Sequence, residues 1–251
     1  MITRNYFKIV RVFPDPSDYF YIKNEGYESG TIGFYPNGDE LRENLEYKID
    51  NGSWAKIADN MEEESIYFDL QPNSKLYLRG TTGHWKNVEG EGPYFEEFGF
   101  DISIGGDLRT LLDYTDVDSV TTIPEGCFNY AFTIGSLLSI DNLTLGSSVT
   151  TIGSSAFKQM FDGCSQIQKG LDLSGVTTLG TEALTYMYNG CSSLNEAYAP
   201  NVSTWNTGKT TSWLDDVAST GVLYKPANLT IPTNNASGVP SGWTTQTYPQ
   251  N

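Results

Sequence analysis

Basic residues are scarce in this chain. Its 251 residues include 15 Lys and Arg against 31 Asp and Glu, which gives a formal net charge of −16 at pH 7. A field of that sign repels phosphate backbones and anionic lipids, so nucleic acid and membrane surfaces are poor partners. The acidic excess extends over both halves of the chain. It is therefore a property of the whole surface and not of an acidic tail.

Long apolar runs are missing as well, so no membrane-spanning segment is predicted. Residues 1–8 carry charges where a secretion signal has its apolar core. We therefore expect a protein that is made and assembled in the cytoplasm.

Catalytic residue types are few and scattered. His84 is the only histidine, and it lies in a Gly-rich loop without a serine and carboxylate arrangement around it. The sequence has no nucleophile elbow, phosphate-binding loop, dinucleotide fingerprint or metalloprotease helix. We predict a protein that is not an enzyme and that needs no cofactor.

Metal-ligating patterns are weak. The three cysteines, Cys127, Cys164 and Cys191, cannot all pair with each other and lack the paired spacing of a zinc site, so we interpret them as small buried thiols. Carboxylates cluster at residues 62–64 and 113–118, but the spacing of a calcium-binding EF-hand is missing. A solvated acidic turn is the favoured interpretation, and a structural calcium ion remains the alternative. No metal ligand is assigned.

What the sequence does contain is a repeat. Three similar phrases occupy residues 121–194, and their aliphatic anchors Ile123, Ile152 and Leu179 lie 29 and then 27 residues apart. A period in the twenties is typical of a solenoid, in which each unit buries its apolar face against the next. We expect stacked coils in which the equivalent residues Phe128, Phe157 and Leu184 share one core.

Each repeat also has an internal pattern. Five residues of the second repeat predict one face of a short helix: Ala156, Phe157, Met160, Phe161 and Cys164. Gly163 and Gly190 would end the helices of their repeats. Alternating residues at 143–145 and 171–173 predict a short strand after each turn.

These phrases resemble a known family. Residues 160–165 (MFDGCS) and 187–194 (MYNGCSSL) are similar to the repeat of BspA-like leucine-rich-repeat proteins. The closing phrases at residues 212–214, 218–221 and 241–244 resemble the ends of such proteins from Bacteroidetes and their phages. The resemblance covers the last part of the chain, and it implies a surface or virion binding scaffold without catalytic residues.

The first part of the chain predicts a different architecture. Candidate strands rich in aromatic and β-branched residues occur at 6–13, 19–24, 31–35, 45–49, 54–57, 66–70, 76–79 and 98–104. Asn51-Gly52 between two of them indicates a tight hairpin, and Gly105-Gly106 would end the last strand. The phrases at 46–57 and 76–85 also resemble the β module that precedes these repeats in related phage proteins.

We therefore predict a mixed β and α/β fold in two domains. Residues 1–104 would form an antiparallel, Ig-like β-sandwich for attachment. Residues 105–251 would form a BspA-like leucine-rich-repeat domain, with caps at residues 105–120 and 195–251 that cover its two ends.

The aromatic residues leave two interpretations open. Five tryptophans and sixteen tyrosines could fill cores and caps, which we favour, or could offer a platform for sugar rings. The candidate ligand-binding residues are Trp85, His84 and Tyr94, in or beside the loop at residues 80–93, because loop residues are often exposed to ligands.

The sequence thus predicts a non-enzymatic structural or adhesion protein of a virion, such as a phage head or tail fibre component. Its partners would be other virion proteins and a host-surface glycan or protein. We expect a homo-oligomer, with a trimer favoured. The alternative is a bacterial surface adhesin or glycan-binding module, located on the cell surface.

Overall fold

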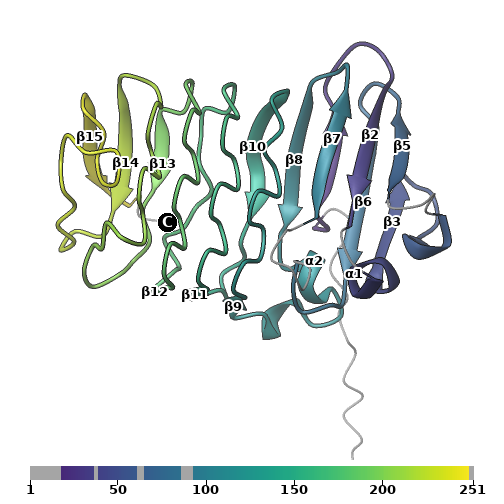
Figure 1. Ribbon diagram of the computed structural model, residues 1–251, viewed down its shortest axis with the longest axis horizontal. Helices are drawn as coiled ribbons and strands as arrows, with labels where there is room; N and C mark the ends of the chain where they lie inside the picture. The colour runs from purple at the N-terminus through teal and green to yellow at the C-terminus, as the bar shows by residue number, and fades with distance from the viewer. Residues whose placement is uncertain (1–17, 37–38, 61–64, 86–92, 249–251) are drawn as a thin grey trace, which may run out of the picture.

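The computed structural model describes residues 18–36, 39–60, 65–85 and 93–248 (Figure 1). Most of its regular structure is β-strand, arranged in several sheets, so the predicted β-rich mixed fold is confirmed. The candidate strand at residues 6–13 and the acidic run at residues 62–64 lie outside the described residues. Figure 1 shows an elongated molecule in which the N-terminal sheets occupy one end and β13–β15 the other.

A six-stranded sheet begins the fold, in the order β10-β8-β1-β6-β3-β4. Its neighbours are antiparallel except β8 and β10, which are parallel. The predicted hairpin at Asn51-Gly52 is confirmed, because β3 pairs with β4 and Gly52 donates to the carbonyl of Ile49 at 2.9 Å. The strands are β1 (Tyr21–Asn24), β3 (Leu45–Ile49), β4 (Ala55–Lys56), β6 (Lys75–Gly80), β8 (Ile102–Asp107) and β10 (Leu137–Thr144).

A second, antiparallel sheet has the order β5-β2-β7, with β2 at Gly30–Tyr35, β5 at Ile66–Leu70 and β7 at Tyr94–Phe98. Alternate residues of β5 are buried and exposed, as expected for a strand with one face on a core. Tyr47 of β3 contacts Phe68 of β5 with ring centroids 4.8 Å apart, so side chains of the two sheets pack against each other.

Helices are short: α1 (Asp39–Asn44), α2 (Thr110–Asp113) and the 3-10 turns η1 (Ala58–Asn60) and η2 (Val117–Ser119). Helix α2 lies in the segment expected as the first cap, residues 105–120, and it buries Leu111 and Leu112. Arg109 anchors this region, since its guanidinium pairs with Asp107 at 2.6 Å and donates to Ser148 Oγ at 2.6 Å.

The three repeat phrases lie side by side. β11 (Thr151–Ile152) pairs in parallel with β9 (Thr122–Ile123) on one side and with β12 (Thr178–Leu179) on the other, in the register that the phrases predict. A second parallel sheet follows, in the order β13 (Glu196–Tyr198), β14 (Gly221–Lys225) and β15 (Trp243–Thr247). The segment that was expected as a C-terminal cap thus contains three further paired strands.

The predicted helices within the repeats are wrong. Residues 153–164 form consecutive turns in which the amides of even-numbered residues, such as Met160 to Phe157, bond to a carbonyl three residues back. The amides of odd-numbered residues instead reach the next segment, as Phe157 to Ala183 at 2.9 Å and Phe161 to Met187 at 3.0 Å. Residues 180–191 bond in the same alternating way to residues 209–215. We call residues 124–134, 153–164, 180–191 and 206–216 the turn segments.

The buried pattern explains the error. In the second turn segment, pairs of buried residues recur every four positions, at 156–157 and 160–161 and again from Cys164. Left-handed backbone recurs with the same spacing, at Ser155, Gln159 and Gly163, with φ of 54°, 55° and 76°. A helix has a period of 3.6 residues, so a strict period of four indicates turns.

The expected common core is confirmed, since Phe128, Phe157 and Leu184 are all fully buried. Beside them a column of aromatic rings crosses the molecule with neighbouring centroids 5.4–6.5 Å apart: Phe20, Phe132, Phe161, Tyr188, Trp213 and Trp205. This column joins the N-terminal sheets to the last turn segment.

Three expectations about strand ends are corrected. Residues 98–104 are not one strand but the end of β7, a turn at Gly99 and the start of β8. Gly105-Gly106 does not end β8, because glycine there leaves room for the Tyr21 ring. Leu171 and Leu173 are buried but lie outside any strand.

The division at residues 104 and 105 stays a prediction, and the pairing of β8 with β10 continues the sheet across it.

Gly180 tests the close approach between segments. A Cβ at Gly180 would lie 2.7 Å from Ser154 Cα, whereas one at the exposed Gly175 would lie no closer than 3.6 Å to Val149 O. We expect Gly180→Ala to lower the free energy of unfolding by about 1–3 kcal/mol, as overpacking does, and Gly175→Ala to leave it nearly unchanged. Urea denaturation of both variants checks this. Equal stabilities would contradict the close packing.

Candidate functional site

The predicted ligand residue Trp85 belongs to the core. Its side chain is fully buried, and its ring lies 5.7 Å from Phe34 and 5.9 Å from Phe128 between centroids. Trp85 therefore offers no ring face to a sugar, which corrects the platform interpretation at this residue. An indole buries more apolar area than most side chains, which favours the core position of Trp85.

The other two candidates, His84 and Tyr94, have different surroundings from Trp85. His84 is partly buried, and its backbone N–H donates to Thr82 Oγ1 at 3.2 Å. Tyr94 is half-buried on the outward face of β7, and its ring stacks on Tyr35. Tyr94 thus belongs to a group of surface residues that the sequence patterns did not predict.

Three outward tyrosines form that group: Tyr35 on β2, Tyr67 on β5 and Tyr94 on β7. We call it the tyrosine corner, a name that denotes these three surface residues and not the motif of the same name in immunoglobulin domains. The Tyr35 and Tyr94 rings are stacked at 4.6 Å with an interplanar angle of 6°, and Tyr67 stands at 85° to Tyr35. The hydroxyls of Tyr35 and Tyr67 are 3.0 Å apart. Tyr67 is 52% exposed, so its ring faces solvent.

Strand register explains why these rings meet. Tyr35 is directly opposite Tyr94, and Gly33 is directly opposite Tyr67. A Cβ at Gly33 would lie 3.1 Å from the Tyr67 ring and 3.3 Å from the Tyr35 ring, so only glycine leaves both rings in place. The signal in the sequence is the alternation of β2, with Ile32 and Phe34 buried between outward residues.

Carboxylates border the corner. Tyr35 donates its hydroxyl to Glu96 at 3.1 Å, and Thr31 donates to Asp69 at 2.7 Å on the same outward face. The hydrogen bond with Tyr67, partial burial and the neighbouring Glu96 carboxylate together raise the pKa of Tyr35. The phenol of Tyr35 therefore stays protonated and holds Glu96 beside the rings.

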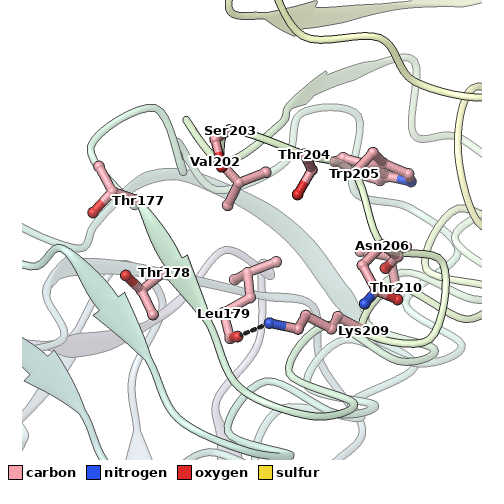
Figure 2. Close-up of a pocket in the computed structure, with 10 residues that line it drawn as sticks. All are labelled: Thr177, Thr178, Leu179, Val202, Ser203, Thr204, Trp205, Asn206, Lys209 and Thr210. Atoms are coloured by element: carbon pink, nitrogen blue, oxygen red, sulfur yellow. Dashed lines mark hydrogen bonds between the residues drawn. The ribbon is translucent and has the colours of Figure 1, made fainter.

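A pocket lies beside β12, in the part of the chain that follows the repeats (Figure 2). The Trp205 pocket, about 170 Å3 in volume, lies between β12 and residues 202–210. Figure 2 shows the hydroxyls of Thr178, Ser203 and Thr204 and the ammonium of Lys209 around it. The Trp205 ring closes one side, and its Nε1 donates to the Ser237 carbonyl at 2.8 Å.

The pocket occupies the position of a strand that is missing. The carbonyl of Ile152 accepts the amide of Gly180 at 2.8 Å, but residues 201–208 form no strand beside β12. The equivalent carbonyl of Leu179 accepts a hydrogen bond from the Lys209 ammonium instead, as the dashed line in Figure 2 marks. Lys209 thus stabilises the open edge of β12, and this role in the fold accounts for its position.

The acidic run at residues 113–118 is tied into the fold. Asp113 Oδ1 accepts from the hydroxyl of Thr115 at 2.6 Å, and Asp118 pairs with Arg109 at 3.2 Å. Over the described ranges, no group of three His, Cys, Asp or Glu residues has an arrangement that could hold a metal ion. Asp113 and Asp118 thus have partners within the protein.

The three cysteines are free and buried, as predicted. Cys164 Sγ donates to the carbonyl of Phe132 and Cys191 Sγ to that of Phe161, both at 3.1 Å. Burial raises the pKa of the Cys164 thiol to about 12 and raises that of Cys191 as well. The thiols therefore pack between segments as neutral groups.

Comparison with known protein families, with curated proteins and with solved structures finds no match to this chain. In the part of the chain that the structure describes, no helix has the length and apolar character to cross a bilayer.

The cysteines give a test of the packing between segments. Native protein should react with a thiol reagent far more slowly than urea-unfolded protein, because the thiols are buried and protonated. Their contribution to stability should be complete below about pH 8.5, the ordinary thiol pKa, and should be lost as the pH rises toward 12. Thiol labelling and unfolding at several pH values check both. Fast labelling of all three native cysteines would contradict the packing.

Proposed function

We propose that this chain is a non-enzymatic structural and adhesion protein of a virion, a phage head or tail fibre component. In this proposal residues 105–251 form a short BspA-like leucine-rich-repeat solenoid, and the N-terminal Ig-like sandwich attaches it to the particle. The protein is made in the host cytoplasm and acts on the virion, where it meets other virion proteins and a host-surface glycan or protein.

One observation carries the proposal: the phrases that resemble the family are the ones that pair from segment to segment. Phe161 in the first phrase donates to Met187 at the start of the second, and Gly163 donates to Asn189 at 2.8 Å. Repeats that satisfy each other's backbone in this way support a coil of leucine-rich-repeat type. The continuous ladder also supports a rigid scaffold, which suits a fibre better than it suits an enzyme with moving parts.

The second candidate is a bacterial surface adhesin or glycan-binding module. The tyrosine corner favours it, because Tyr67 is exposed to solvent and tyrosine, which has an apolar ring and a polar hydroxyl, is enriched at binding interfaces. This candidate differs from the first in location and not in the kind of activity, so the location of the protein separates the two.

Mass spectrometry of purified virions tests the proposal. Virions from a host that carries this gene should contain peptides of the chain in a constant ratio to the major capsid protein across a density gradient. A host cytosolic protein serves as the control for contamination. Peptides that remain with the cell envelope instead would favour the surface adhesin.

Oligomerisation is the second expectation. Among the strands that the structure describes, β5 and β7 form the two edges of the three-stranded sheet, and sheet edges favour association with another chain. A fibre also gains avidity from several linked sites. We expect light scattering at physiological salt to give about three times the 27.8 kDa chain mass, with association that strengthens as salt screens the acidic surfaces. A mass of one chain at all concentrations would exclude the trimer.

A further inference from the structure

We propose that the tyrosine corner binds an uncharged saccharide, an inference that rests on the adhesion function proposed above. The ligand site consists of Tyr35, Tyr67 and Tyr94 with the adjoining carboxylates of Asp69 and Glu96. It lies on the outward face of the β5-β2-β7 sheet.

The shape of the corner suits a sugar ring. Tyr67 at 85° to the stacked Tyr35 and Tyr94 pair gives two aromatic surfaces that meet at an angle. A pyranose has an apolar C–H face that can lie on one ring while its edge meets the other. Tyrosine suits this task because it offers a rigid apolar face and a polar hydroxyl at the same time.

The polar groups suit the hydroxyls of a sugar. Glu96 Oε2 lies 3.1 Å from the Tyr35 hydroxyl, at the edge of the two rings, and is exposed. An ionised carboxylate only accepts hydrogen bonds and can accept several at once. It can therefore take a hydrogen bond from a sugar hydroxyl while it keeps the one from Tyr35, and such charge-assisted bonds are strong.

The charge of the surface selects against acidic sugars. Glu96 contacts Tyr35, Asp69 is the next outward residue of β5 after Tyr67, and the chain as a whole carries −16. A uronic acid, a sialic acid or a sulfated sugar would bring like charge to these carboxylates at short range. An uncharged saccharide meets the same acceptors without that repulsion.

The other sheet shows how differently outward aromatics are used when they serve the fold. On the six-stranded sheet, the Arg79 guanidinium lies 4.0 Å from the Trp54 ring centre and the Lys75 ammonium 3.8 Å from that of Tyr21. Those cations cover the rings, and Tyr21 is buried. Tyr67 in the corner is 52% exposed and has hydroxyl and carboxylate neighbours.

A protein partner would need a different surface. A stable protein interface buries about 800 Å2 on each side around an apolar centre. The corner covers short strands and has carboxylates among its rings, so a small hydroxyl-rich ligand suits it better. Binding of a protein at the corner would count against the proposal.

Affinity gel electrophoresis of the full chain tests the site. The gels would contain galactomannan, xyloglucan or pullulan as uncharged probes and polygalacturonate as the anionic one. We expect retardation by at least one uncharged probe and none by polygalacturonate. Tyr67→Ala should weaken the binding about tenfold, which corresponds to about 1.4 kcal/mol, and Tyr67→Phe, which keeps the ring, should weaken it less.

Tyr186→Ala is the matched control, since Tyr186 is also exposed but lies on a turn segment. It should leave retardation unchanged, and thermal unfolding of each variant checks that the fold is retained. Absence of retardation by all three uncharged probes, or an equal loss in Tyr67→Ala and Tyr186→Ala, would overturn the site. The virion location is tested separately: saccharide binding by a chain that is missing from virions would reject the fibre and keep the site.

Discussion

From Ser155 to Gly163 and from Leu184 to Gly190, every second amide finds its hydrogen-bond acceptor in the following turn segment, and the rest of the structure depends on this constraint. Because a buried amide without a partner is costly, a single segment cannot be stable alone. The segments must lie in register, and the register in turn places Phe128 against Phe157 and Phe161 against Tyr188. Backbone pairing and side-chain packing therefore specify the same arrangement, which is a mark of sequences that fold to one state.

The sequence patterns predicted features whose cause is local. The Asn51-Gly52 turn and the alternation in β5 need only their own residues, and both are found where expected. The period of four in residues 156–164 resembles the pattern of a helix, because over so few residues a period of 3.6 and a period of four place most apolar side chains alike. What distinguishes the turns from a helix is a hydrogen bond to a segment 26 residues away, such as the one from Phe157 to Ala183. A pattern within residues 156–164 carries no information about that partner.

The candidate sites were harder to predict for a similar reason. Loop position suggested that Trp85 is exposed, but the structure buries it against Phe34 and Phe128. The tyrosine corner brings together strands that begin at residues 30, 66 and 94, so only the sheet order creates it. The Trp205 pocket exists because a strand beside β12 is missing, and the sequence gives no positive signal for an element that does not form.

The four-residue spacing of left-handed backbone in the turn segments limits how their length can change. Inserting one residue after Gln159 would move Phe161 and Cys164 off the buried face and would give the odd-numbered amides the wrong direction. Inserting four would restore both the buried pairs and the alternation of amides. Segments of this kind can therefore lengthen or shorten only in whole steps of four residues. The extent of the molecule along a turn segment can therefore change only in steps of four residues, whereas its extent across the segments changes by whole segments.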